Sequence, residues 1–287
     1  MRRIIGRKQL DTGIDTANPE QAAHWNERAG RSWAELGDML DRLLAPFVPL
    51  VLGEVAPVAG KRILDVGCGA GALTLAAAER GAQGLGVDIS APLIEAARAR
   101  AERKGMESAD FVQADAQTQF FAPESFDAIV SRFGVMFFAD PLAAFRNLHA
   151  AAAPGARLAC LAWRGPGEND FMVTAERAAA EILPLPERPE KGPGQFGFAA
   201  PGRVRAVLAD SGWIDGAVRA VDVACTMSEA DLAVYARRMG PVAQLLPTLD
   251  EALRSEVERR VDAAFRAFVR DGAASFTAAC WLVTARA

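Results

Sequence analysis

The stretch Ile63–Leu75, with the sequence ILDVGCGAGALTL, holds the residue types best suited to binding a ligand. An apolar run that contains Asp65 leads into a glycine-rich turn, and an Ala/Leu-rich helical pattern follows. The glycines alternate along the turn, at Gly67, Gly69 and Gly71. Glycine tolerates positive φ and lets a ligand approach the main chain, while the first turn of a helix offers unpaired amides to an anion. This strand, turn and helix therefore predict a site for a nucleotide-like ligand.

Elements that could hold this turn in place follow in a regular order. Apolar strand patterns alternate with helical patterns over residues 61–164, which predicts a doubly wound, mostly parallel α/β sheet of the Rossmann type. Ser90 and Asp140 stand where each can cap a helix, and Pro141 suits a first helical turn. Ligands of such sheets bind beyond the carboxyl ends of the strands, so the residues after each strand are expected to form the site. The predicted strands are Arg62–Val66, Gln83–Asp88, Ala109–Gln113, Phe126–Arg132 and Ala156–Trp163.

Segments on either side of this core predict a cover for the site. Apolar residues at helical spacing from Trp33 to Phe47 predict one amphipathic helix before the core. A Pro- and Gly-rich segment over 183–201 predicts a loop that could act as a lid, and two further strands complete a seven-strand sheet. The predicted parts are a flexible lead-in (1–22), an N-terminal helical cover (23–60), a ligand-binding core (61–164), a lid loop with a helix and sixth strand (165–227), a helical cap insertion (228–274) and a final edge strand (275–287).

Composition favours a protein that handles a small molecule. The 287 residues are 51% hydrophobic, ample for a core, and their net charge of −4 offers no basic field for nucleic acid or an anionic membrane. The 4 cysteines lie far apart and only 2 histidines are present, so no metal site is expected. No apolar run is long enough to cross a bilayer and no apolar signal core precedes Asp11, which predicts a cytoplasmic protein without membrane insertion.

The glycine turn alone admits two kinds of cofactor. Gly67, Gly69 and Ala72 also satisfy the dinucleotide pattern G-x-G-x-x-A, which leaves an NAD-type site open. Asp65 favours another ligand, because dinucleotide sites usually carry an apolar residue at that position. A carboxylate there can accept hydrogen bonds from a ligand's ammonium group, directly or through water. At this point the sequence resembles the class I S-adenosylmethionine (SAM)-dependent methyltransferases, whose first motif is an acidic residue followed by GxGxG.

The resemblance covers residues 62–164 and implies roles for residues after three further strands. Asp88, in GLGVDIS, resembles the carboxylate that takes both ribose hydroxyls, and Ile89 resembles the apolar residue that packs on the adenine. Asp115, in FVQADAQ, resembles the acceptor for the adenine amino group, with Ala116 presenting its backbone amide. The segment FDAIVSRFGVMFFADP, over 126–141, resembles the fourth-strand motif. The cofactor residues so implied are Asp65, Gly67, Gly69, Gly71, Asp88, Ile89, Asp115, Ala116 and, at the methionine end, Ser131, Arg132 and Phe133.

The sequence carries clear motifs for the cofactor but only isolated candidates for the catalytic and acceptor-binding residues. Methyl transfer from a sulfonium is a direct displacement, and alignment in a water-poor pocket can supply much of the acceleration. A hydroxyl or protonated amine acceptor would gain from a base, and His24 could cover the site; an exposed or structurally paired imidazole is the alternative. Arg164 could bind an anionic group or pair with Glu168 or Asp170. The acceptor-facing candidates are Trp25, Phe137, Phe138, Arg164, Asn169 and Phe171, with Phe196 and Phe198 in the lid loop.

These features predict a SAM-dependent methyltransferase that acts on a small, apolar or aromatic acceptor and releases S-adenosylhomocysteine (SAH). The motifs resemble the group that includes ubiquinone-, menaquinone- and natural-product-type methyltransferases, although the downstream signature of the quinone enzymes is absent. An NAD(P)-dependent oxidoreductase and a non-catalytic SAM-binding protein are the alternatives. The short-chain reductase form needs a lysine four residues after a tyrosine, whereas Met239 follows the sole tyrosine, Tyr235, at that spacing. The acceptor, the atom methylated and the oligomeric state stay open.

Overall fold

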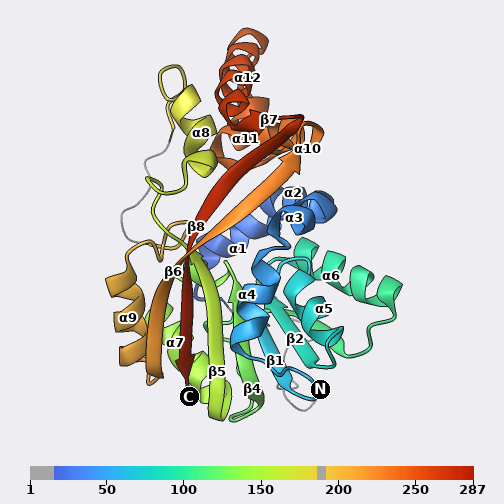
Figure 1. Cartoon of the computed structure of the whole chain (residues 1–287), viewed down its shortest axis with the longest axis vertical. Coiled ribbons are helices and arrows are strands. Elements are labelled where there is room, and N and C mark those ends of the chain that lie inside the picture. The colour runs from blue at the N-terminus through green and yellow to red at the C-terminus, as the bar shows by residue number, and fades with distance from the viewer. Residues whose placement is uncertain (1–15, 186–191) are drawn as a thin grey trace.

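A central sheet organises residues 16–185 and 192–287, which the computed structural model describes (Figure 1). Its strands run in the order β3-β2-β1-β4-β5-β8-β6, and a short β7 pairs with β8 off this path. Strands β1 to β5 pair in parallel, whereas β8 is antiparallel to β5 and β6. The predicted Rossmann-like, mostly parallel sheet is confirmed, with β7 added to its seven strands. The edge position predicted for the final strand (275–287) is wrong, because β8 lies between β5 and β6, and β6 forms the edge. The strands are β1 (Arg62–Val66), β2 (Gln83–Asp88), β3 (Ala109–Gln113), β4 (Phe126–Arg132), β5 (Ala152–Trp163), β6 (Ile214–Ser228), β7 (Val269–Arg270) and β8 (Ala273–Arg286).

Helices on both faces of the sheet make it doubly wound. In Figure 1, α4 (Phe47–Glu54), α5 (Ala72–Ala78) and α6 (Ala91–Lys104) lie on one side, and α7 (Pro141–Ala151) and α9 (Pro201–Asp210) on the other. The predicted caps are present: Ser90 Oγ accepts a hydrogen bond from Leu93 N, and Asp140 Oδ1 accepts one from Ala143 N. Because β1, β2 and β4 run parallel, with helices as the connections between them, their carboxyl ends lie at the same edge of the sheet.

Short helices, rather than one long helix, form the N-terminal cover. The single amphipathic helix predicted from Trp33 to Phe47 is wrong, because the segment breaks at Leu36, just before Gly37, and again before Phe47, next to Pro46. The predicted lead-in over 1–22 lies mostly outside the described residues, and its last four residues belong to the first helix. The helices before α4 are α1 (Pro19–Asn26), α2 (Arg28–Glu35) and α3 (Gly37–Leu44).

A long antiparallel ribbon carries the late helices. Figure 1 shows β6 and β8 extending together beyond the other strands and ending beside the cap helices. The cap consists of α10 (Glu229–Arg238), α11 (Gly240–Leu245) and α12 (Glu251–Phe265), broken near the prolines that predicted the interruptions, Pro241 and Pro247. The sequence interpretation missed α8 (Asp170–Ala179), which packs on α12. In the described ranges, no helix combines the length and the apolar character that a membrane span needs.

Candidate functional site

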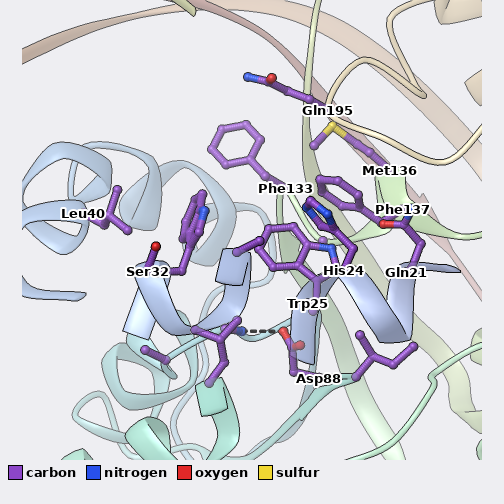
Figure 2. Close-up of a pocket in the computed structure, with 18 of the residues that line it drawn as sticks. Gln21, His24, Trp25, Ser32, Leu40, Asp88, Phe133, Met136, Phe137 and Gln195 are labelled. Atoms are coloured by element: carbon purple, nitrogen blue, oxygen red, sulfur yellow. Dashed lines mark hydrogen bonds between the residues drawn. The ribbon is translucent and has the colours of Figure 1, made fainter. Parts of the chain in front are cut away.

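A cavity of about 980 Å³ lies where the parallel strands end, under the N-terminal cover (Figure 2). Residues after β1, β2, β3 and β4 form its floor, α1 to α3 form one wall, and α10 and α11 of the cap contribute another. This volume is at the upper end of the range for small-molecule sites, which gives room for a cofactor and a second molecule. The site therefore lies between the parallel core, the N-terminal cover and the cap.

The turn after β1 packs backbone against backbone on the turn after β4. A Cβ added at Gly67 would lie 2.6 Å from Gly134 Cα, and one added at Gly134 would lie 2.4 Å from Val66 O. Ser131 Oγ donates to Val66 O at 2.7 Å and accepts from Gly134 N at 3.1 Å. Ser131 is thus fully buried between the turns and does not line the cavity, although it was predicted to line the methionine end.

The three predicted glycines have different places in the turn. All adopt positive φ, at 65° for Gly67, 55° for Gly69 and 84° for Gly71. Gly67 and Gly69 line the cavity, as predicted for the cofactor turn. Gly71 lies outside the lining and caps α5, where an added Cβ would meet the Phe111 ring at 2.7 Å. Its role is therefore to let the helix pack closely on the sheet.

Asp65 is a buried carboxylate with one oxygen left for a ligand. Oδ2 accepts a hydrogen bond from Thr74 Oγ1 at 2.7 Å, whereas Oδ1 has no hydrogen-bond partner among the described residues. The side chain is 1% exposed and lines the cavity. Burial raises its pKa to about 6, against the opposing effects of the Thr74 hydrogen bond and the Arg132 charge. An orphaned, buried carboxylate oxygen costs free energy, so this atom suits a cationic donor such as an ammonium group.

Asp88 is aimed into the cavity by two backbone amides. Oδ2 accepts from Gly69 N at 2.8 Å and Oδ1 accepts from Ser90 N at 2.9 Å; the carboxylate and one of its hydrogen bonds are visible in Figure 2. Burial raises its pKa, while these backbone hydrogen bonds lower it. Each carboxylate oxygen keeps acceptor capacity, so the group can bind two neighbouring hydroxyls. Ile89 follows it and also lines the cavity.

Asp115 fastens the start of the cover to the end of β3. Its Oδ2 accepts from Thr16 Oγ1 at 2.8 Å, from Ala17 N at 3.1 Å and from Asn18 Nδ2 at 2.6 Å. Asn18 is 4% exposed, and its Oδ1 accepts from the amide of Ala139, after β4. Asp115 and its neighbour Ala116 line the cavity, as predicted, but these contacts with the cover were not predicted. Asp115 Oδ1 accepts one described hydrogen bond, from a backbone amide two residues on.

Aromatic rings form the part of the cavity next to the glycine turn. Phe133 has φ 67°, in the left-handed region that bulky residues avoid, and its ring stacks on Trp163 with centroids 3.7 Å apart. Trp25 meets Phe137 edge-on at 5.3 Å and Trp33 at 5.9 Å. Figure 2 shows Trp25, Phe133 and Phe137 around one space. Trp25, Phe137 and Phe138 line the cavity as the acceptor prediction required.

His24 is the one histidine that lines this cavity within the described ranges. It lies in the last turn of α1, and its imidazole meets the Trp25 ring edge-on at 5.3 Å. Burial lowers its pKa, and the nearby Glu27 carboxylate partly opposes this shift. The imidazole is therefore mostly neutral at pH 7 and can accept a proton.

The remaining predicted acceptor residues lie outside the cavity, and that part of the prediction is corrected. Arg164 forms ion pairs with Glu168 and Asp222, the first of which was the stated alternative. Phe171 stacks on Phe276 at 3.8 Å within the core. Neither Phe196 nor Phe198 belongs to the cavity lining, and both belong to the core packing. The side chain of Asn169, the last of this group, is only 1% exposed.

Asn169 instead joins β8 to the segment that follows β5. Its Nδ2 donates to Arg164 O, Gly165 O and Ala279 O, and its Oδ1 accepts from Ala279 N at 2.9 Å. Asn169→Ala is expected to lower the free energy of unfolding by about 2–4 kcal/mol, because it strands buried backbone groups. Chemical denaturation measures this loss. At a temperature where the variant is folded, its affinity for SAH should stay within about twofold of that of the wild type. A loss below about 0.5 kcal/mol would contradict this structural role.

Several lining residues had no sequence signal as site residues. They come mostly from the cover and the cap. Nothing in their sequence pattern indicated that these side chains face the carboxyl ends of the strands. Tyr235 is one of them; burial raises the pKa of its phenol to about 12. The others of most interest are Asn18, Arg28, Leu40, Gln195, Met239 and Gln244.

Comparison with known proteins agrees with this site. Residues 64–160 match the family model described as a methyltransferase domain. The chain is 34% identical over 202 residues to demethylmenaquinone methyltransferase of Thermus thermophilus, covering 61% of this chain and 87% of that protein. It is 38% identical over 146 residues to aklanonic acid methyltransferase DauC of a Streptomyces species, covering 48% of this chain and 66% of DauC. An uncharacterized protein of Mycobacterium bovis is 34% identical over 168 residues, and the match spans 60% of its length and 57% of this chain.

Solved structures share the fold at low sequence identity. Phosphoethanolamine N-methyltransferase 2 of Haemonchus contortus, solved with SAH, has a TM-score of 0.58 at 17% identity and covers 95% of this chain and 61% of that one. The [4+2]-cyclase SpnF has a TM-score of 0.58 at 19% identity and covers 96% of this chain and 98% of its own. At this identity the solved structures show a shared fold only. The match of 34% identity over 87% of the Thermus enzyme shows the family. The chain belongs to the family of SAM-dependent methyltransferases, whose cofactor is SAM.

Proposed function

We propose that this protein transfers a methyl group from SAM to a small, predominantly apolar or aromatic acceptor. The observation that carries the proposal is the buried, unpartnered Oδ1 of Asp65, beside the glycine turn in a cavity that continues between aromatic rings. The first feature suits the ammonium of an amino-acid cofactor, and the second suits a flat, apolar acceptor. The methyltransferase relatives named for demethylmenaquinone and aklanonic acid support a small-molecule acceptor.

The residues of this chain fit the cofactor at several points. Asp65 would hold the ammonium and Asp88 the two ribose hydroxyls, since both carboxylates keep acceptor capacity in the cavity. Ile89 would pack on the adenine, and Asp115 Oδ1 with the amide of Ala116 would read its edge. Bound SAM would supply an electrophilic methyl group on a sulfonium.

The protein's own contribution to the reaction is to position the acceptor and exclude water. Direct displacement would need the acceptor's nucleophilic atom held against the methyl group, with the sulfur keeping the electron pair of the bond it loses. Trp25 and Phe137 would pack on the acceptor and align it, and their edge-on contact keeps that wall rigid. His24 would take the proton that a hydroxyl or ammonium acceptor loses, because burial keeps its imidazole mostly neutral.

Outside the core, the N-terminal cover (23–60) and the cap insertion (228–274) would select the acceptor. Both contribute side chains to the same cavity, through Trp25 and Trp33 on one side and Tyr235 and Met239 on the other. The described cysteines are all buried and unpaired, which suits a reducing compartment and supports action in the cytoplasm.

Calorimetric titration with SAH and with NADH tests the cofactor assignment. We expect SAH to bind and NADH not to bind, because SAH carries an ammonium group for the buried Asp65 Oδ1 whereas NADH carries none. Binding of NADH without SAH would overturn the proposal. Turnover of SAM to SAH that depends on an added hydroxylated aromatic compound then separates a methyltransferase from a protein that only binds SAM.

The role of His24 predicts a specific pH dependence for any hydroxyl acceptor found in that screen. The acidic limb of kcat/KM for the acceptor should have an apparent pKa below 6.5, since burial lowers the pKa of this imidazole. The profile is measured with SAM saturating at every pH, so that protonation of Asp65, whose pKa is raised to about 6, does not contribute a limb of its own. His24→Asn should remove that limb and lower kcat by about 100-fold. SAH affinity serves as the control and should be unchanged. An acidic limb that persists in the variant would exclude His24 as the base.

A further inference from the structure

Two arginines at the rim of the cavity have no carboxylate partner in the described part of the chain. Arg28 and Arg31 lie three residues apart in α2, so they share one side of that helix, and both are exposed residues of the cavity lining. Arg28 Nη1 donates to Gln244 O of α11 at 3.1 Å, which holds this side chain beside the cap. The Arg31 guanidinium has no hydrogen bond or ion pair with any described residue. Both groups therefore keep N–H donors for a ligand.

The other side-chain charges that the cover and the cap contribute to the lining are compensated. Each belongs to an ion pair, and the pairs are Arg237 with Asp262, Glu35 with Arg238 and Asp41 with Arg100. Arg28 and Arg31 therefore leave the rim with a local positive charge, although the whole chain has a net charge of −4. Such a charge attracts anions to the mouth of the cavity and repels cations from it.

The floor of the cavity carries the opposite charge. Asp65, Asp88 and Asp115 lie at or near the carboxyl ends of β1, β2 and β3, and all three line the cavity. Within the described ranges, Arg132 is the one lining cation on this floor. The carboxylates suit a cofactor with a sulfonium and an ammonium, and they would repel an anionic group of the acceptor. An anionic acceptor would therefore enter with its uncharged part foremost and keep its charge at the rim.

Aromatic rings connect the rim to the floor. Trp33 lies in α2, the helix of the two arginines, and its ring meets the Trp25 ring at 5.9 Å. Trp25 in turn meets Phe137, which follows β4, edge-on at 5.3 Å (Figure 2). A flat molecule that packs along these rings would reach from α2 towards the glycine turn. Its outer end would then face Arg28 and Arg31.

We propose that the acceptor is a flat aromatic compound that bears a carboxylate, and that Arg28 and Arg31 bind this carboxylate at the rim. The inference rests on the proposed function and names its substrate class. A guanidinium matches the geometry of a carboxylate, and a charge at the rim stays partly hydrated, so its desolvation costs little. Held by this outer end, the acceptor would direct a different group, at its inner end, towards the glycine turn.

Calorimetry with matched aromatic acids and amides, in the presence of saturating SAH, tests this assignment. The probes are caffeate and the anthraquinone carboxylate rhein, each with its primary amide, which removes the charge and keeps the shape. Wild type is expected to bind at least one acid about 5- to 20-fold more tightly than its amide, the effect of a partly hydrated charged contact. Arg28→Gln should lose most of this preference, and a double variant that also carries Arg31→Gln should lose all of it. Arg237→Gln is the matched control: Arg237 lines the same cavity but pairs with Asp262, so the preference should be unchanged.

The outcomes separate this inference from the proposed function. If wild type does not bind SAH, the proposed function falls and takes the inference with it. If SAH binds and neither acid binds more tightly than its amide, whether both bind equally or none binds, the inference alone is overturned. That comparison uses wild type only, so it does not depend on the folding of any variant. A preference for the acids that persists in the double variant would overturn the assignment to Arg28 and Arg31.

Discussion

Asp65→Asn is expected to weaken SAH binding by about 10- to 100-fold and, in the same protein, to make the ligand-free fold more stable. The affinity loss follows from removing a charged acceptor for the ammonium group. The stability gain follows from burial, which raises the pKa of Asp65 from 3.8 to about 6 in the folded state. A carboxyl with a raised folded-state pKa destabilises the fold when ionised, above pH 6, and this cost disappears as the pH falls. The difference between these two pKa values limits the gain in the free energy of unfolding to about 3 kcal/mol. We expect a gain of about 1–2 kcal/mol at pH 7.5.

Urea denaturation at pH 7.5 and pH 5, with SAH calorimetry, measures both effects. The stability gain should shrink at pH 5, where Asp65 of the wild type is largely protonated. Asp127→Asn is the matched control: Asp127 pairs with Arg62 at 2.9 Å, and this hydrogen bond holds its pKa below the usual range. That substitution should therefore destabilise the fold at pH 7.5. Loss of stability in both variants would show that Asp65 is a structural group rather than a ligand-binding one.

Gly134→Ala is expected to lower the free energy of unfolding by about 2–4 kcal/mol and to abolish measurable SAH binding. Gly134 has φ −84°, which any residue adopts, so the effect comes from space alone. Its new Cβ would lie 2.4 Å from Val66 O and 2.7 Å from Gly67 Cα. Backbone atoms cannot rotate away as a side chain can, so the two turns must separate, and the glycine turn would lose its shape.

Gly69→Ala provides the comparison for this prediction. Gly69 also lies in the turn, yet an added Cβ would meet nothing within 4 Å. Its φ of 55° should cost about 1 kcal/mol of stability, while the new methyl group would stand in the cofactor cavity. Calorimetry should therefore show lost SAH affinity in both variants, with a large stability loss only in Gly134→Ala. A change below about 0.5 kcal/mol for Gly134→Ala would mean that the turns tolerate separation.

The parallel core was predictable because its signals are local. Each of its first four strands is a short apolar run between turn residues, and the predicted bounds of β1 to β4 agree with the structure. Ser90 and Asp140 cap their helices through backbone groups three residues away, so their roles are also local. Asp65 and the glycine turn drew attention for the same reason, since motif and structure lie within one continuous stretch.

The acceptor side was poorly predicted because its residues meet only in three dimensions. Asp115 binds Asn18, and Tyr235 faces the same cavity as Trp25 although more than two hundred residues separate them in the chain. Asn169 and Arg164 follow a strand as site residues do, yet β8 lies beside β5, and the two residues bond to Ala279 and Asp222 instead of a ligand. Polarity and chain position alone cannot distinguish these cases.

By itself, then, the sequence determined the strands of the parallel core, the glycine turn and the cofactor class, because residues close in the chain form those features. Only the tertiary structure decided which charges remain available to a ligand. Arg132 is the last residue of β4 and Arg164 directly follows the neighbouring parallel β5, so each could have faced an anion. Arg164 forms ion pairs with two carboxylates, whereas Arg132, whose charge lowers the pKa of Asp65, donates one hydrogen bond among the described residues, to Leu44 O. The cost of burying a charge depends on its partners in space, and those partners come from distant segments.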